Sequence, residues 1–275
     1  MGSAHQEANT RFVKGLARAI AGAVIFALPM LMTMEMWSLG FYIPSWKLAL
    51  LLVLFFPVLV VLSWHAGFEP TFSWKDDTVD ALVAYAVGFA TSAGILWLTG
   101  GLEAGASLQE GVGKVSLQAV PASIGALLAQ SQLGEQPAGQ PRGGLQHYAS
   151  ELFIMGIGAL FLAFNLAPTE EMVLIAARVT PCQPVLVALV SLAAMHAFVY
   201  GAAFRGGPQH HGQVAAWSLF LRYSVVGYAL ALLLCAAMLW WFDRFNGLAL
   251  GPTLRIVVVL GFPAGVGAAA ARLIL

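Results

Sequence analysis

Seven long apolar stretches, separated by polar residues, dominate the pattern of hydrophobic and polar positions along the chain. They cover residues 17–41, 47–64, 79–99, 151–178, 184–204, 215–241 and 254–274. A helix needs about 20 mainly apolar residues to cross the hydrocarbon core of a bilayer, and each stretch comes close to that length or exceeds it. The pattern therefore predicts seven membrane-spanning helices.

An eighth stretch, residues 112–131, is apolar but interrupted. The interrupting polar residues are Lys114, Ser116, Gln118, Ser123 and Gln130. Because the stretch lies between two clear spans, we expect it to cross the membrane as well, shielded from lipid by its neighbours. The predicted fold is thus an all-α, polytopic transmembrane helical bundle of about eight spans.

Composition supports the membrane assignment and argues against some classes of function. The chain of 275 residues is 60% hydrophobic and 9% charged, whereas a soluble domain has about 25% charged residues. Its formal net charge is zero and it has no basic block, so nucleic acid is not an expected partner. The chain contains no phosphate-binding loop, zinc-protease motif or nucleophile elbow, so we expect neither an enzyme nor a cofactor.

Polar connections and basic residues predict the topology. Residues 1–13 form a polar N-terminal segment, and residues 135–146, rich in Gly, Pro and Gln, have the composition of a flexible linker. With the N-terminus inside and eight spans, eight Lys and Arg residues fall on the cytoplasmic side and five on the other. This bias favours a cytoplasmic N-terminus.

The two halves of the chain resemble each other. Shifting the second half by 136 positions aligns AGAVIFALPMLMTMEMW with IGALFLAFNLAPTEEMV, and a shift of 142 aligns VPASIGALLA with FPAGVGAAAA. The pairs that coincide include Gly22 with Gly158, Thr33 with Thr169, Glu35 with Glu171 and Gly125 with Gly267. We therefore predict two four-helix repeats, residues 14–134 and 147–275, in parallel orientation. They would be inverted if residues 112–131 only re-enter the membrane.

The repeated Thr-x-Glu-Met sequence is the main candidate for chemistry. A charge near the bilayer centre costs about 3 kcal/mol, so intramembrane carboxylates usually face a protein interior or water. Pro29 and Pro168 precede the acids, and a proline-broken helix followed by a carboxylate can hold an ion. The predicted ion-binding or proton-relay residues are Glu35, Glu171, Glu170, Thr33, Thr169 and Asn165. The same letters also suit an ordinary helix start, with Thr as N-cap and acids in the first turn.

Four further polar residues are secondary candidates, and the metal is unknown. His196 could relay protons or bond across helices, and Gln118 could line a cavity. Asp80 and Arg222 coincide at the 142 shift and could form a salt bridge between repeats, or each could reach the cytoplasmic surface separately. Small residues at Gly261 and Gly265, and at Ala122 and Ala126, predict close helix packing within the chain or in a homo-oligomer.

Four strings together resemble a known family. PTEEMVLIAARVTP, MHAFVYGAAFRG, TFSWKDDTVDALVAYAVGF and VPASIGALL are similar to an uncharacterised family of bacterial integral membrane proteins, a domain of unknown function. The resemblance covers most of the chain from about residue 15 and implies a bacterial inner-membrane location, with lipid as a partner. The residues themselves predict a transporter or channel for a small cation or a proton. The alternative is a non-transporting scaffold or sensor.

Overall fold

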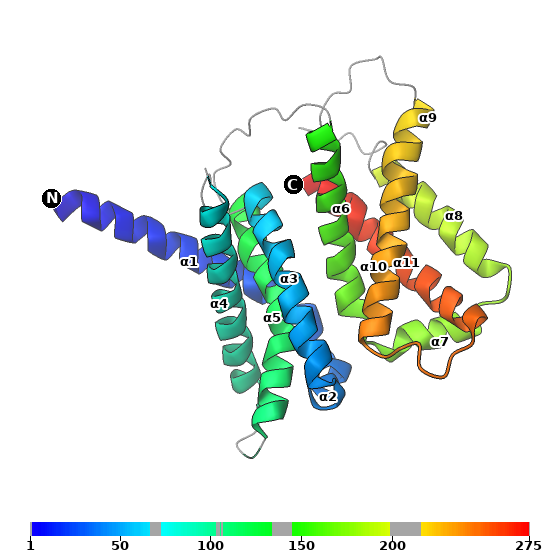
Figure 1. The fold of residues 1–275 in the computed structure, drawn as a ribbon, viewed down its shortest axis with the longest axis horizontal. Helices are drawn as coiled ribbons and strands as arrows, with labels where there is room; N and C mark the ends of the chain where they lie inside the picture. Colours follow the sequence, from blue (N-terminus) through cyan, green and yellow to red (C-terminus); the bar gives the residue numbers. More distant parts are fainter. Residues whose placement is uncertain are drawn as a thin grey trace. The chain divides into compact units, whose positions relative to one another are not determined.

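The structure is a computed structural model, and it describes residues 2–66, 73–102, 105, 107–133, 145–198 and 216–274. Every regular element in these ranges is a helix (Figure 1). The predicted all-α class is therefore confirmed. The chain forms two compact units, Met1–Gln140 (unit 1) and Pro141–Leu275 (unit 2).

Unit 1 is built around one central helix. Its elements are α1 (Gly2–Leu31), α2 (Met34–Tyr42), α3 (Ser45–Ala66), α4 (Trp74–Leu98) and α5 (Leu108–Leu133). Helix α5 packs against all four others, and 89% of its spanning residues are buried, compared with 28–39% for the spans of α1, α3 and α4. Four of the interrupting polar residues are buried among these helices, as the sequence predicted: Lys114, Ser116, Gln118 and Ser123.

Unit 2 follows a similar succession of elements. They are α6 (Leu145–Leu166), α7 (Glu170–Arg178), α8 (Gln183–His196), α9 (Ala216–Leu219), the π-helix η2 (Phe220–Val225), α10 (Val226–Trp241) and α11 (Leu250–Ile274). Helix α11 packs against α6, α7, α8 and α10 and takes the central place here. The π-helical turn η2 joins α9 to α10 without interrupting the helical run.

Seven helices in the described ranges are long and apolar enough to cross a membrane. They are Val13–Leu31, Ser45–His65, Trp74–Leu98, Leu108–Ala129, Tyr148–Leu166, Phe220–Trp241 and Leu250–Leu273. Helices α7 and α8 pass the same test only as a pair, with a bend of 119° between them, and raise the number to eight. Large apolar side chains such as Val53 and Leu54 on α3 point outwards, as the lipid-facing side of a membrane helix requires.

Two of the predicted apolar runs are each divided into two helices, in agreement with the proline-broken elements that the sequence predicts. The apolar run 17–41 is divided, because α1 ends at Leu31 and α2 begins at Met34, and the run 151–178 is divided between Leu166 and Glu170. In the second case Pro168 provides the reason, since the residue before a proline is disfavoured in helical conformation. Hydropathy cannot reveal either break, because the residues at the breaks are mostly apolar.

Other predicted features lie partly outside the described ranges. The linker 135–146 falls almost entirely between α5, which ends at Leu133, and α6, which begins at Leu145. The span predicted over 184–204 is described as far as residue 198. The repeat boundaries 14–134 and 147–275 stay predictions.

Glycines permit the closest helix crossing in each unit. A Cβ atom on Gly22 of α1 would overlap the carbonyl oxygen of Gly125 on α5. A Cβ atom on Gly158 of α6 would overlap the carbonyl oxygen of Gly267 on α11 in the same way. These glycines let the two backbones touch at each crossing.

The other small-residue faces also pack inside their own units. Gly261 and Gly265 of α11 lie against Tyr228 of α10, and Ala122 and Ala126 of α5 are completely buried. They therefore serve packing within the chain, and a homo-oligomer stays a prediction.

Candidate functional site

The break between α1 and α2 is held by hydrogen bonds to the end of α1. Thr33 is extended (φ −100°, ψ 128°), and its Oγ1 donates to the carbonyl oxygen of Met30 at 2.8 Å. The indole nitrogen of Trp37 donates to the carbonyl oxygen of Leu31 at 3.0 Å. Pro29, in the last turn of α1, has no amide hydrogen to contribute. The exposed carbonyl groups at the helix end are thus satisfied locally by side chains.

The break between α6 and α7 repeats this arrangement 136 positions later. Thr169 is extended (φ −77°, ψ 146°), and its Oγ1 donates to the carbonyl oxygen of Leu166 at 2.8 Å. Asn165 occupies the place of Pro29, and its Nδ2 donates to the carbonyl oxygen of Phe161 at 2.7 Å. Its Oδ1 is buried and has no hydrogen-bond partner among the described residues. An unused amide oxygen therefore lies at the end of α6.

The two threonines take the N-cap position without capping. Each precedes the first residue of a nine-residue helix, but neither hydroxyl bonds to the amides of that helix. Each hydroxyl instead secures the end of the preceding long helix. The simple N-cap interpretation therefore describes the position of these residues but not the bonds that they make.

The predicted glutamates lie in the first turns of the two short helices. Glu35 follows the first residue of α2 and is partly exposed, and Glu170 and Glu171 open α7 and are exposed. The positive end of a helix dipole stabilises a carboxylate by about 0.3–1 kcal/mol, which accounts for acids at these positions. Hydropathy alone indicates one continuous helix around Glu35. In the structure Glu35 lies in the short helix α2, after the break. Glu35 and Glu171 belong to different units, and their pairing stays a prediction.

No ready-made metal centre accompanies these acids in the part of the chain that the structure describes. No group of three or more His, Cys, Asp or Glu side chains is close enough there to hold a metal ion. A cation at the breaks would therefore need hydroxyl, amide or carbonyl oxygens beside one carboxylate. Hard cations accept such ligands.

The secondary candidates have separate surroundings. In unit 2 the Nδ1 of His196 lies 3.0 Å from the Oγ of Ser224, so this histidine bonds across helices, and the side chain of Arg222 is exposed. In unit 1 Asp80 accepts a hydrogen bond from Ser63 at 3.2 Å. Gln118 is 1% exposed, and its Oε1 has no partner among the described residues. A bridge between Asp80 and Arg222 stays a prediction.

Two buried ion pairs lie outside the residues predicted from the sequence. In unit 1 Lys114 binds Glu110 four residues earlier on α5 and also donates to the carbonyl oxygen of Gly101 at 3.0 Å. In unit 2 Arg272 of α11 binds Glu151 of α6 at 2.8 Å. The spacing of four between Glu110 and Lys114 was a usable signal, because such side chains are neighbours on a helix. The second pair joins distant parts of the chain and left no local signal.

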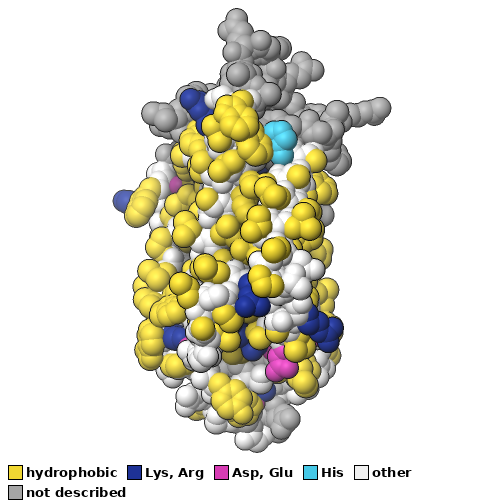
Figure 2. Space-filling view, turned by 90° about the vertical axis from the view of Figure 1, so that its right-hand side faces the viewer, with side chains coloured by type: hydrophobic (Ala, Val, Ile, Leu, Met, Phe, Trp, Pro, Cys, Tyr) yellow, Lys and Arg dark blue, Asp and Glu magenta, His cyan; other side chains and the backbone are white. Residues whose placement is uncertain are grey.

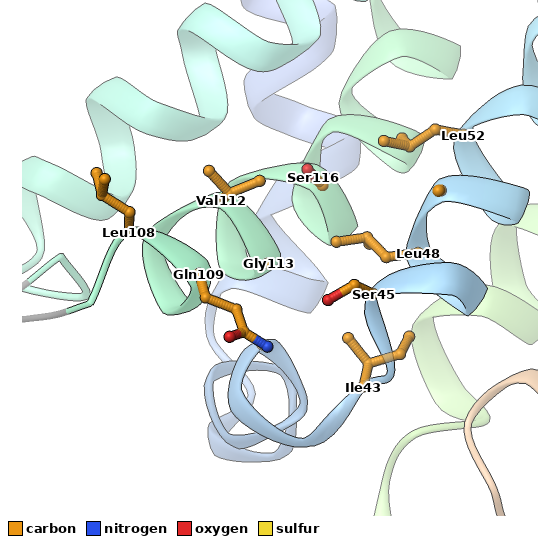
Figure 3. Close-up of a pocket in the computed structure, with 11 residues that line it drawn as sticks. Ile43, Ser45, Leu48, Leu52, Leu108, Gln109, Val112, Gly113 and Ser116 are labelled. Atoms are coloured by element: carbon orange, nitrogen blue, oxygen red, sulfur yellow. The ribbon is translucent and has the colours of Figure 1, made fainter.

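An apolar pocket lies beside α2. It has a volume of about 400 Å³, and its lining comes from α2, α3, α5 and the α2–α3 turn. Leu48 and Leu52 on α3 face Val112 and Ser116 on α5 across it (Figure 3). The described residues that line this pocket include no charged side chain, and their apolar character suits a hydrocarbon group better than a hydrated ion. It is therefore not the place where we expect a cation.

Removing either threonine hydroxyl should destabilise the protein. We expect Thr33→Val and Thr169→Val each to lower the free energy of unfolding by about 1 kcal/mol, the usual value of one buried hydrogen bond. Denaturation in mixed micelles would measure the loss. Thr253→Val is the control, because its hydroxyl donates to Ala249 on an exposed helix surface. An unchanged stability of both break variants would show that these hydroxyls do not hold the breaks.

Comparison with known proteins assigns the chain to a family. Residues 15–275 match the model of the family described as "Putative integral membrane protein (DUF2391)". No curated protein and no solved structure matches the chain. The match covers nearly the whole chain and agrees with the apolar, multi-span helical fold. The chain therefore belongs to this family of integral membrane proteins of unknown function.

Proposed function

We propose that this protein is a cation transporter or channel, with a proton as one candidate for the ion. The observation that carries the proposal is the shared geometry of the two helix breaks. In each unit a long helix ends, a threonine hydroxyl bonds back to its last turn, and a nine-residue helix begins with a carboxylate in its first turn. Discontinuous helices of this kind place oxygen atoms and helix ends beside an ion.

The oxygen atoms at the breaks support binding of a hard cation. Thr33 and Thr169 donate their hydroxyl hydrogens to carbonyl groups, which leaves the lone pairs of Oγ1 available to a cation. Asn165 adds a buried Oδ1 that has no partner within the described residues. The carboxylates of Glu35 and Glu171 supply the negative charge. Together these groups are of the type that small cations and protons use.

Duplication of one ancestral unit is part of the proposal. Helices α2 and α7 have the same length and lie 136 positions apart, and the glycine crossings between α1 and α5 and between α6 and α11 use residues that the sequence alignment pairs. Two units with parallel repeats would place their breaks on the same side of the membrane. We further propose a bacterial inner-membrane location with a cytoplasmic N-terminus, in line with the Lys and Arg bias.

Ion flux through proteoliposomes would test the function. We expect Glu35→Gln and Glu171→Gln each to lower the initial flux at least tenfold, because the amide keeps the shape of the side chain and removes its charge. The probes are a proton gradient followed with a pH-sensitive dye, and K⁺, Na⁺ and Mn²⁺ gradients tested separately. Asp76→Asn is the matched control, since Asp76 is an exposed acid in the first turn of α4 and lies outside both breaks.

The outcomes separate transport from the alternative function. Parental flux in both Glu35→Gln and Glu171→Gln, or no flux of any probe through the parent protein, would contradict the proposal. A scaffold or sensor predicts that these substitutions change thermal stability or partner binding instead. The apparent melting temperature of each variant in detergent would therefore accompany every flux measurement.

A further inference from the structure

Two arginines lie together at one end of unit 2. Arg178 is the last residue of α7, and Arg255 stands in the second turn of α11. The Nη1 of Arg255 lies 3.4 Å from the carbonyl oxygen of Val179, the residue that follows Arg178. Helices α7 and α11 pack against each other, so this contact is part of their interface. The guanidinium group of Arg255 therefore lies beside the backbone that directly follows Arg178.

Neither arginine has a carboxylate partner among the described residues. Arg178 is exposed and Arg255 is partly buried, and within the described ranges the carbonyl group of Val179 is the only partner of either side chain. Elsewhere in the same unit Arg272 is paired with Glu151. Most of the ten N–H donors of the two guanidinium groups are therefore free for an outside acceptor.

The nearby acidic side chains do not form ion pairs with Arg178 or Arg255 among the described residues. Glu170 and Glu171 open α7, and Arg178 follows at its other end, about 10 Å further along the helix axis. Asp243 and Arg244, on the turn between α10 and α11, have opposite charges and add no net charge. The basic charge is thus concentrated where α7 ends.

The surface around the arginines is apolar. Leu174 and Ile175 on α7 are 55% and 45% exposed, and Leu250 and Leu254 on α11 are 74% and 56% exposed. Figure 2 looks onto the side of Figure 1 on which α7 and α8 lie, and in its lower half Lys and Arg side chains, with an acidic side chain beside them, lie among hydrophobic ones. Exposed leucines beside unpaired arginines are typical of the boundary between acyl chains and headgroups.

We propose that Arg178 and Arg255 bind the phosphate of an anionic phospholipid from the surrounding membrane. Guanidinium groups match phosphate oxygens with paired N–H donors, and two of them give a stronger site than one. The exposed leucines and Ile175 would contact the acyl chains of the same lipid. A free phosphate could use the arginines but would gain nothing from the apolar side chains, which is why a lipid is the better ligand. This site does not depend on the proposed cation transport.

Lipid binding to the purified full chain would test the site. Native mass spectrometry in detergent would compare added phosphatidylglycerol, which is anionic, with phosphatidylcholine, which is neutral overall. We expect the parent protein to retain phosphatidylglycerol in preference, and Arg178→Gln with Arg255→Gln to weaken that retention at least fivefold. Arg222→Gln is the matched control, because Arg222 is exposed on η2 and lies outside this cluster.

Three results would overturn the proposal. They are equal retention of the two lipids by the parent protein, equal loss of phosphatidylglycerol in Arg222→Gln, and full displacement of the lipid by inorganic phosphate at equal concentration. If the double variant does not fold, Arg178→Lys and Arg255→Lys replace it. These keep the charge and should retain part of the preference, since lysine lacks the paired donors of arginine.

Discussion

Lys114→Met is expected to destabilise unit 1 by about 3–5 kcal/mol, the cost of leaving one buried charge without its partner. Lys114 and Glu110 are each 7% exposed, and the methionine would remove the only cation found near the Glu110 carboxylate in the described part of unit 1. It would also remove the hydrogen bond to Gly101 and the contact of the ammonium group with the Phe41 ring at 5.2 Å. Three supports of the start of α5 would be lost together.

Denaturation in mixed micelles would measure this loss. Lys75→Met is the control, because Lys75 is exposed in the first turn of α4 and should change stability by less than about 0.5 kcal/mol. The double variant Glu110→Gln with Lys114→Met should recover much of the loss, since it removes both buried charges. If Lys114→Met were as stable as the parent, the ion pair would have no structural role.

Gly125→Leu is expected to have the second largest effect, a loss of about 3 kcal/mol or of folded protein altogether. The new side chain would begin with a Cβ atom that overlaps the carbonyl oxygen of Gly22 and presses against Phe26. Neither the backbone of α1 nor that of α5 can give way without separating the helices, and inserting atoms into a packed core typically costs 1–3 kcal/mol or more. Gly267→Leu should act in the same way on α6 and α11 in unit 2.

Gly94→Leu is the matched control for both glycine variants. Gly94 lies inside α4, and no atom lies within 4 Å of a Cβ placed there. Leucine favours a helix more than glycine does, so this variant should be as stable as the parent or slightly more stable. The yield of monodisperse protein after detergent extraction would measure folding of all three glycine variants. Normal recovery of Gly125→Leu would show that α1 and α5 do not cross at this point.

Hydropathy predicted the spans, and Pro29 and Pro168 indicated breaks within two of them, but the residues at which the helices end could not be predicted. Hydropathy located α3, α4 and α11 because a lipid-facing helix must be apolar along its whole length, whereas α5 was inferred from its place between two clear spans. The end of α1 was missed because Met32 and Met34 are as apolar as the helix before them, and the break depends on a hydrogen bond from Thr33. Periodicity and hydropathy do not report single hydrogen bonds.

The candidate site could be predicted in part. The repeat drew attention to Thr33 and Thr169, and the structure gives each of them the same bond to the preceding helix. Glu35 lies in the first turn of α2, after the break, and its depth in the membrane stays a prediction. Glu151 and Arg272 were missed because they meet only after α6 packs on α11, and tertiary contacts of this kind leave no pattern in one sequence.

The burial of α5 has a consequence for how the protein enters the membrane during synthesis. Its mean hydropathy is 1.4, compared with 2.5 for α3, and it carries an ion pair and a buried amide that lipid would not solvate. Such a helix gains little free energy from entering lipid alone. We expect its insertion to depend on earlier helices that are already in the membrane and can pack against it. Because α1, α3 and α4 precede α5 along the chain, the ribosome synthesises the surrounding helices of unit 1 before the central helix that packs among them.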